Sequence, residues 1–537
     1  MRQGDKKAAG RSGMGGQVLK EAFKVGWVRE EIREVVKRSL QLGYVANSWR
    51  KSVGIIIRKP NKEDYRNPNS YRIINLLQVL GKVVERIVAR RLEKWGPEGM
   101  GDEQYGGRGG RSCMDGVDRL YEKWEKGGKK GVLLCMNVRG GYENVGVGKC
   151  MERMRGLGVD EYLVKWGSSF LRDREVRVRV GNRVSGGGKM RGETVQGSPL
   201  SPIVFMYILG AVLEELSKDN VEGVEMMGCV DDVEFMMVGE DERSIKERVR
   251  RMEVGLERGL KKWEVDVQVM KVEGMWMWKD GVGFDRGIRW LGEEVRMKTE
   301  LRVLGVWMEE NGGWRSHVVN RLRIGEVRWR MMMKLLGRGG RGMCVEGLKR
   351  IWNMVVEQSV LYGMELYWNG QEEMRRVLLV WLNRGMRRIL GAVRSTLVDA
   401  MLGELGKRRV EWDFDRRVKS WGKRLLRKGE GEYFAKTWKE REVGYGCYES
   451  GWGGRMFRRV KENKLEGEKW DVESERLGNG KWGVWVEENK KKGKDRWERG
   501  MVEREREWLV GASDGSGEGV GIGIGGGLWE GGEKLMD

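Results

Sequence analysis

Two adjacent carboxylates, Asp231 and Asp232, are the residues whose type and spacing most directly indicate chemistry in this chain. They lie between two largely apolar runs, residues 224–227 and 235–238. This pattern predicts a strand, a tight turn and a second strand. Such a hairpin would carry both carboxylates to the rim of a sheet, where oxygen ligands can bind a divalent metal ion. Taken alone, the commoner interpretation is a polar turn with an ordinary acidic pair.

The elements that must position this pair are indicated by hydrophobic periodicity. Residues 131–136 form a continuous apolar run that is typical of a strand buried on both faces, and Asn137 follows it directly. In residues 80–92 the apolar side chains recur on one side of a helix whose other side is charged. The same reasoning predicts a helix from Gln17 to Gln41 and a strand at 53–57 that leads into a charged loop.

The composition indicates a polyanionic partner. The chain of 537 residues contains 103 Lys and Arg against 81 Asp and Glu, which gives a formal net charge of +22. A basic surplus of this size suits nucleic acid or an acidic membrane surface. No apolar run approaches the roughly 18 residues of a membrane-spanning helix. The first residues also lack the apolar segment of a signal peptide.

The scarcity of histidine and the spacing of cysteine exclude several other site types. The single histidine, His317, rules out a histidine-based metal site or catalytic triad. The six cysteines contain no CxxC pair, which argues against a zinc module and for a reducing compartment.

Several sequence motifs follow one another along the chain in a characteristic order. They are Ile55-Ile56-Ile57-Arg58-Lys59-Pro60, Asn69-Ser70-Tyr71-Arg72-Ile73-Ile74-Asn75-Leu76-Leu77, Gln104-Tyr105-Gly106-Gly107-Arg108-Gly109-Gly110-Arg111-Ser112, Trp166-Gly167-Ser168-Ser169-Phe170-Leu171, Gln196-Gly197-Ser198-Pro199-Leu200-Ser201-Pro202 and Cys229-Val230-Asp231-Asp232. Together they resemble the motifs of non-LTR (LINE-type) retrotransposon reverse transcriptases, as a degenerate and truncated copy. Gly107 stands where that family has Phe, and Ile73 stands where it has Pro.

The resemblance implies an α+β fold of the right-hand polymerase type, with fingers, palm and thumb. A helical region and a truncated RNase H-like start are expected after it. The implied ranges are an N-terminal segment at 1–40, fingers and palm at 41–310, a helical thumb and connection at 311–410, a basic linker at 411–505 and an incomplete RNase H-like segment at 506–537.

The resemblance also assigns the metal site of two-metal nucleotidyl transfer. Asn137, Asp231 and Asp232 occupy the three catalytic positions that bind two Mg²⁺ ions, with Mn²⁺ as the alternative ion. Asn137 stands where the family has Asp, so one negative charge between the two ions is missing. Losing one such electrostatic group commonly costs about 3–4 kcal/mol of transition-state stabilisation. That corresponds to roughly a hundred- to thousandfold in rate.

Five further positions match nucleotide-binding residues of the family. Lys59 and Arg72 match residues that contact the triphosphate, for which a point charge and a bidentate fork are both suited. Tyr142 matches the aromatic residue that excludes a 2′-hydroxyl. Gln196 and Gly197 match a turn against the template and the nascent base pair. A solvated basic loop remains the alternative for the two cations, and plain turn geometry remains the alternative for Gly197.

The sequence therefore predicts an RNA-directed DNA polymerase that extends a DNA primer on an RNA template with deoxynucleoside triphosphates. The alternative is an inactive retroelement remnant that only binds nucleic acid, and Asn137 is the residue that favours it. No membrane is expected among the partners. An intracellular protein is expected, nuclear for a target-site reaction.

Overall fold

The computed structural model describes residues 8–60, 62–128, 130–138, 146–190, 194–267, 269–278, 287–335, 343–367, 372–409, 414, 416–417, 420–421, 521–522, 528–530 and 533–536. The chain divides into two compact units, Met1–Asn320 and Arg321–Asp537. Most of the linker expected at 411–505 and the motif Asp514-Gly515-Ser516 lie outside the described residues.

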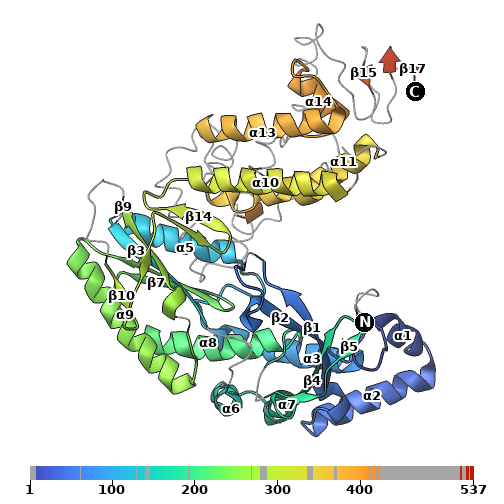
Figure 1. The fold of residues 1–537 in the computed structure, drawn as a ribbon, viewed down its shortest axis with the longest axis vertical. Helices are drawn as coiled ribbons and strands as arrows, with labels where there is room; N and C mark the ends of the chain where they lie inside the picture. Colours follow the sequence, from blue (N-terminus) through green and yellow to red (C-terminus); the bar gives the residue numbers. More distant parts are fainter. Residues whose placement is uncertain are drawn as a thin grey trace. The chain divides into compact units, whose positions relative to one another are not determined.

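A mixed sheet in the first unit carries the Asp231-Asp232 hairpin, and α5 (Cys113–Lys126) and α9 (Glu242–Trp263) lie beside it (Figure 1). Its strand order is β12-β9-β3-β8-β7, and β3 pairs antiparallel with both β8 and β9. The strands are β3 (Lys130–Asn137), β7 (Val224–Cys229), β8 (Asp232–Val238), β9 (Glu273–Trp278) and β12 (Arg296–Met297). The apolar run at 131–136 is therefore a central strand, as predicted, and its residues alternate between two covered faces.

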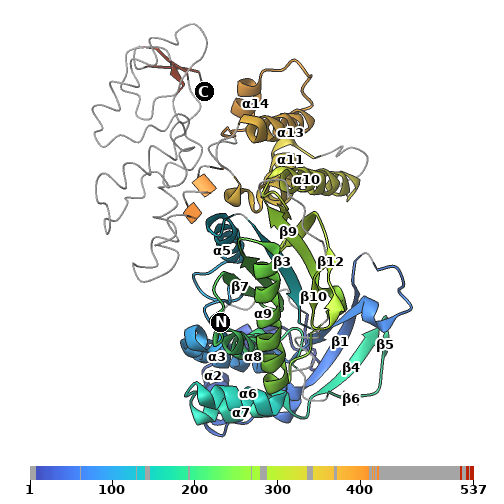
Figure 2. The ribbon, with the colours of Figure 1, turned by 90° about the vertical axis from the view of Figure 1, so that its left-hand side faces the viewer.

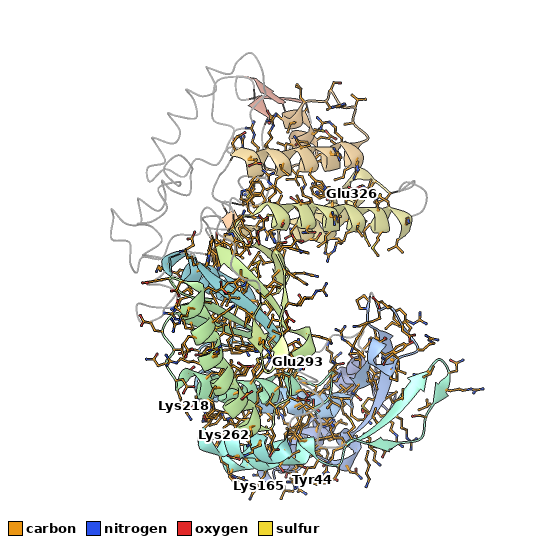
Figure 3. All side chains as sticks on the ribbon, turned by 60° about the vertical axis from the view of Figure 1, so that its left-hand side comes forward. Tyr44, Lys165, Lys218, Lys262, Glu293 and Glu326 are labelled. Atoms are coloured by element: carbon orange, nitrogen blue, oxygen red, sulfur yellow. A yellow bond between two sulfur atoms is a disulfide. The ribbon has the colours of Figure 1, made fainter. Side chains whose placement is uncertain are left out.

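Helices cover both faces of this sheet. Val132, Leu134 and Phe235 pack into one core with α8 (Ser201–Ser217) and α9 (Glu242–Trp263). Helix α8 is buried nearly all round, because α9, α4 (Gly96–Met100) and α6 (Val147–Gly156) pack against it. Glu215 ties the two helices together, since its Oε1 accepts from Lys218 at 2.7 Å and from Lys262 at 2.5 Å (Figure 3). On the opposite face lies α5 (Cys113–Lys126), which begins with a capping box formed by Ser112 and Asp115.

A second sheet of the first unit has the strand order β2-β1-β4-β5, with β6 paired to β4 (Figure 2). Its strands are β1 (Lys51–Arg58), β2 (Tyr71–Leu76), β4 (Glu175–Val180), β5 (Arg183–Val184) and β6 (Gly188–Lys189). β1 pairs antiparallel with β2 and parallel with β4.

Two short hairpins lie outside these two sheets. One pairs β10 (Arg289–Trp290) with β11 (Glu293–Glu294), and the other pairs β13 (Glu300–Val303) with β14 (Val306–Glu309).

The remaining α-helices of the first unit surround these sheets. They are α1 (Gly16–Ala22), α2 (Gly26–Gln41), α3 (Val79–Leu92), α4 (Gly96–Met100), α6 (Val147–Gly156) and α7 (Glu161–Leu171). The prediction of a single helix from Gln17 to Gln41 is wrong in one respect, because the helix is interrupted between α1 and α2. Between these two helices Val25 is extended, with φ −75° and ψ 121°. The apolar residues keep a helical spacing across this interruption, so the spacing alone could not reveal it.

The described part of the second unit is mainly helical. Its α-helices are α10 (Arg315–Leu335, which begins before the division), α11 (Val345–Ile351), α12 (Gln358–Leu361), α13 (Glu372–Leu390) and α14 (Val398–Glu404). A π-helical turn, Trp352–Glu357, links α11 to α12. The short strands β15 (Gly521–Ile522), β16 (Leu528–Glu530) and β17 (Glu533–Met536) pair antiparallel. No helix in the described ranges combines the length and the apolar character needed to cross a bilayer.

Candidate active site

A two-residue turn joins β7 to β8 and carries the acidic pair, as predicted. Cys229 pairs with Asp232 across the ladder, so Val230 and Asp231 form the turn itself. Val230 has φ +63°, whereas Asp231 is not among the described residues with positive φ. Two-residue hairpins that need a positive φ at the first position prefer glycine there. A β-branched valine in this conformation is strained.

The end of β3 brings Asn137 against this hairpin. β3 and β8 pair from Gly131 and Val238 to Asn137 and Asp232. The Asn137 Nδ2 donates to Asp232 Oδ1 at 2.7 Å, and the Val138 N–H donates to the Asp231 carbonyl at 2.9 Å. The structure therefore brings together all three positions that the sequence assigned to the metal site. Tyr142, the remaining prediction on this segment, lies outside the described residues.

The charges at the hairpin influence one another. Burial raises the pKa of Asp232, the hydrogen bond from Asn137 lowers it, and the neighbouring Asp231 raises it again. Glu234 lies two residues further along β8, on the same face as Asp232. Burial raises the pKa of Glu234 well above its ordinary value, and the charges of Asp232 and Asp231 add to this effect. Its Oε2 has no hydrogen-bond partner among the residues that the structure describes.

Sequence reasoning missed Glu234 as a neighbour of the acidic pair. The available signal was a charged residue at the second position after Asp232, in a strand that is otherwise apolar. Sequence reasoning also missed the disulfide between Cys113 and Cys229. Cys113 is the first residue of α5, and Cys229 directly precedes the turn. These two cysteines are 116 residues apart in sequence, with Cα atoms 6.2 Å apart. No CxxC spacing could indicate such a pair.

The two predicted phosphate-binding cations lie on the second sheet. Arg72 is exposed on β2 opposite Ile57, and the Lys59 N–H donates to the Ser70 carbonyl at 2.8 Å, where the β1–β2 ladder ends. Burial lowers the pKa of Lys271, and the charges of Lys62 and Lys59 lower it further. Lys59 directly follows β1, and Lys271 ends the 3₁₀ turn Val269–Lys271, so positive charges from two distant segments act on one another. Positive charge concentrated in this way suits an anion such as a triphosphate.

The Gln196–Gly197 turn is fixed against the free edge of β2. The Asn75 N–H donates to the Gln196 carbonyl at 2.8 Å. Gly197 has φ +114°, and a Cβ built on it would lie 2.6 Å from the Asn75 carbonyl oxygen. The position therefore requires glycine both for its conformation and for its close approach. Ser198 adds a buried anchor, because its Oγ donates to Glu85 Oε2 at 2.7 Å.

The side chains at the hairpin carry oxygen atoms of the kind that bind a divalent cation. Asp231 and Asp232 offer carboxylate oxygens, and Asn137 carries an amide oxygen, so the donor types fit. The Asn137 amide presents its NH₂ to Asp232, because an ionised carboxylate only accepts. Within the described ranges, no group of three His, Cys, Asp or Glu side chains is arranged to hold a metal ion.

Comparison with known families gives the class of protein. Residues 57–308 match the family model described as reverse transcriptase (RNA-dependent DNA polymerase). This segment contains the hairpin, Asn137 and the Gln196–Gly197 turn. Over this segment the chain is therefore similar to reverse transcriptases, and the match fits the polymerase fold that its motifs predict.

Curated relatives narrow this class. The chain is 22% identical over 374 residues to the putative 115 kDa protein in type-1 retrotransposable element R1DM of Drosophila melanogaster, covering 68% of this chain and 35% of that protein. It is 22% identical over 404 residues to the probable RNA-directed DNA polymerase from transposon BS of the same organism, covering 72% and 43%. The chain is thus similar, at low identity, to non-LTR retrotransposon polymerases, which confirms the resemblance of its motifs. The chain spans less than half the length of either relative.

Solved structures add a distant likeness. The telomerase from Candida albicans in complex with a telomeric RNA fragment matches at 12% identity and a TM-score of 0.36, over 86% of this chain and 69% of that chain. The truncated apo telomerase from Candida tropicalis matches at 10% identity and a TM-score of 0.35, over 50% and 55%. Scores of this size do not establish a shared fold.

Proposed function

We propose that the first unit is the polymerase core of an RNA-directed DNA polymerase that extends a DNA primer on an RNA template. The observation that carries the proposal is the convergence of Asn137, Asp231 and Asp232 at one sheet edge, inside the segment that matches reverse transcriptases. In this proposal the sheet with β3 and β8 is the palm, the sheet with β1 and β2 belongs to the fingers, and α10 to α14 form the thumb and connection.

Each group of residues has a part in the proposed reaction. Asp231 and Asp232 would hold divalent ions, Mg²⁺ or Mn²⁺, with the Asn137 amide oxygen as the remaining donor. When bound, such ions hold the attacking and leaving oxygens and offset their negative charge. Lys59 and Arg72 would orient the triphosphate, together with the neighbouring Lys271. The Gln196–Gly197 turn would support the nascent base pair, since its backbone is fixed to β2.

The wider assignments extend this proposal. Deoxynucleoside triphosphates are the substrates, and the net charge of +22 supports binding of the nucleic-acid backbone without sequence preference. The motif Asp514-Gly515-Ser516 supports an RNase H-like segment at 506–537, although this motif lies outside the described residues. A reaction at genomic target sites would place the protein in the nucleus.

A second candidate function is nucleic-acid binding without catalysis. The observation that favours it is the hydrogen bond from Asn137 to Asp232, in which an amide NH₂ donates to an oxygen of a carboxylate that would otherwise bind a cation. The positive charge of the chain would be retained in such a remnant, whereas extension of a primer would be slow or absent.

Primer extension separates the two candidates. Purified chain is incubated with an RNA template, an annealed DNA primer, deoxynucleoside triphosphates and Mg²⁺, and binding is measured on the same duplex. Extension that is lost in Asp231→Ala, with binding retained, supports the polymerase. Binding without extension, in both the original chain and Asn137→Asp, would refute the polymerase and leave the binding function.

A further inference from the structure

The turn that carries the two carboxylates holds a residue in a conformation that its side chain opposes. Val230 has φ +63°, and β-branched residues rarely adopt this region. Strained residues persist only where the surrounding structure over-determines their conformation. The contacts around Val230 must therefore stabilise the positive φ that its side chain disfavours.

A short segment that precedes α5 supplies these contacts. Gln104 forms a parallel bridge with Gly228 of β7. The Gly228 N–H donates to the Glu103 carbonyl at 2.8 Å, and the Tyr105 N–H donates to the Gly228 carbonyl at 2.8 Å. Residues 103–105 thus add a brief extra strand beside the hairpin, on the edge that β8 does not occupy.

The Gln104 side chain reaches over the turn itself. Its Oε1 accepts from the Val230 N–H at 2.9 Å and from the Gly106 N–H at 3.0 Å. Both partners are donors, so the amide oxygen and not the nitrogen must face the turn. Gln104 is fully buried, at 0% exposure, which makes these hydrogen bonds difficult to replace with water.

The backbone on either side is shaped to admit this side chain. A Cβ at Gly106 would lie 2.8 Å from the Val230 nitrogen, and a Cβ at Gly228 would lie 3.2 Å from Gln104 Nε2. The segment also has a rigid support, because the buried Tyr105 accepts at its hydroxyl from Arg119 of α5 at 3.0 Å. Gln104 is therefore held in place by elements outside the hairpin.

We propose that Gln104 is a positioning residue that keeps the strained Val230–Asp231 turn in the shape that sets Asp231 and Asp232 against Asn137. It acts through the backbone of the turn and touches none of the reacting groups. The proposal rests on the proposed polymerase function, and it goes beyond that function by assigning a role to a residue outside the metal and nucleotide positions.

The test combines a loss of the hydrogen bond with a relief of the strain. Gln104→Met keeps the length of the side chain but removes the acceptor, and Val230→Gly allows the positive φ without cost. Single-turnover extension by Gln104→Met is expected to be about tenfold slower, with an unchanged KM for the primer–template. The double variant Gln104→Met with Val230→Gly is expected to recover most of that rate.

A matched control separates positioning from general destabilisation. Val249→Ala removes buried apolar volume from α9, away from the turn, and is expected to lower the melting temperature without changing the rate of extension. A Gln104→Met rate equal to that of the original chain would overturn the proposal, as would a double variant no faster than Gln104→Met alone.

Hydrogen exchange makes the result independent of activity. If neither the original chain nor Asn137→Asp extends a primer, the proposed polymerase function fails, and the amides of residues 228–232 then decide the role of Gln104. They are expected to exchange faster in Gln104→Met than in the original chain or in Val249→Ala. Equal exchange in all three proteins would refute the positioning role even where extension is absent.

Discussion

Replacing Asn137 by Asp should change the stability of the protein in opposite directions without and with a divalent ion. The present amide donates to Asp232 Oδ1 at 2.7 Å, beside the further negative charge of Asp231. Asn137→Asp exchanges this donor for an acceptor, so metal-free carboxylates would face each other. Like charges at this separation raise the pKa of one partner and destabilise the folded state.

The magnitude follows from the lost hydrogen bond. A hydrogen bond to a charged group contributes about 1.5–3 kcal/mol, and each kcal/mol shifts the melting temperature of a large domain by about 2 °C. In EDTA the Asn137→Asp variant should therefore melt about 3–6 °C below the original chain. Added Mg²⁺ or Mn²⁺ should reverse the difference, because an ion that binds only the folded state stabilises it by mass action.

Two measurements check this prediction. Thermal unfolding is followed in EDTA and across a titration of each ion, with Asp231→Ala as the control that should lose the response. Primer extension is measured in parallel, and Asn137→Asp should be faster by about a hundred- to thousandfold. An Asn137→Asp variant that melts normally in EDTA and gains nothing from either ion would refute the assignment of residue 137 to a metal site.

Three further predictions concern other parts of the molecule. Gly197→Ala should slow extension and lower the melting temperature, because a Cβ would lie 2.6 Å from the Asn75 carbonyl oxygen at φ +114°; normal kinetics would contradict this account of the turn. Burial raises the pKa of Glu225 to about 7, although the Arg119 guanidinium favours its charged form. This group therefore adds stability below its unfolded pKa, and the stability is lost as the pH rises through about 7. In the original chain the unfolding free energy should fall by at most about 3 kcal/mol between about pH 4.5 and 7, and Glu225→Gln should show a smaller fall. Parallel pH profiles of the two proteins would exclude Glu225 as the source of this fall. Binding to an RNA–DNA duplex should weaken by about a thousandfold or more between about 50 and 200 mM salt, since the basic chain releases counterions; a flat dependence in filter binding would argue against backbone contacts.

Local patterns in the sequence predicted the elements of the site correctly. The apolar run at 131–136 is the central strand, and Asp231 lies in the turn of the expected hairpin. Plain turn geometry was the alternative expected for Gly197, and its φ of +114° and its closeness to the Asn75 carbonyl oxygen agree with that alternative. These successes share one cause, because burial, alternation and turn geometry are recorded within a few residues of sequence.

Contacts between distant segments could not be predicted in the same way. That residue 137 faces the acidic pair was inferred only from family resemblance, since strand register depends on the whole sheet. Gln104 bonds to the backbone of Val230, which lies 126 residues away, and a side chain that satisfies a distant N–H leaves no periodic signal. Glu234 was overlooked because one charge hardly alters the apolar pattern of a strand.

The second unit offers an optical probe through three tryptophans whose rings pack against one another. The rings of Trp329 and Trp352 have centroids 5.4 Å apart, and those of Trp352 and Trp381 have centroids 4.9 Å apart. Indoles this close share their electronic excitation, so they give a paired positive and negative band in the far-ultraviolet circular dichroism spectrum. Subtracting the spectrum of a Trp352→Phe variant isolates that contribution, because Trp352 belongs to both pairs. Its loss on heating would report the unfolding of these helices separately from the melting of the first unit.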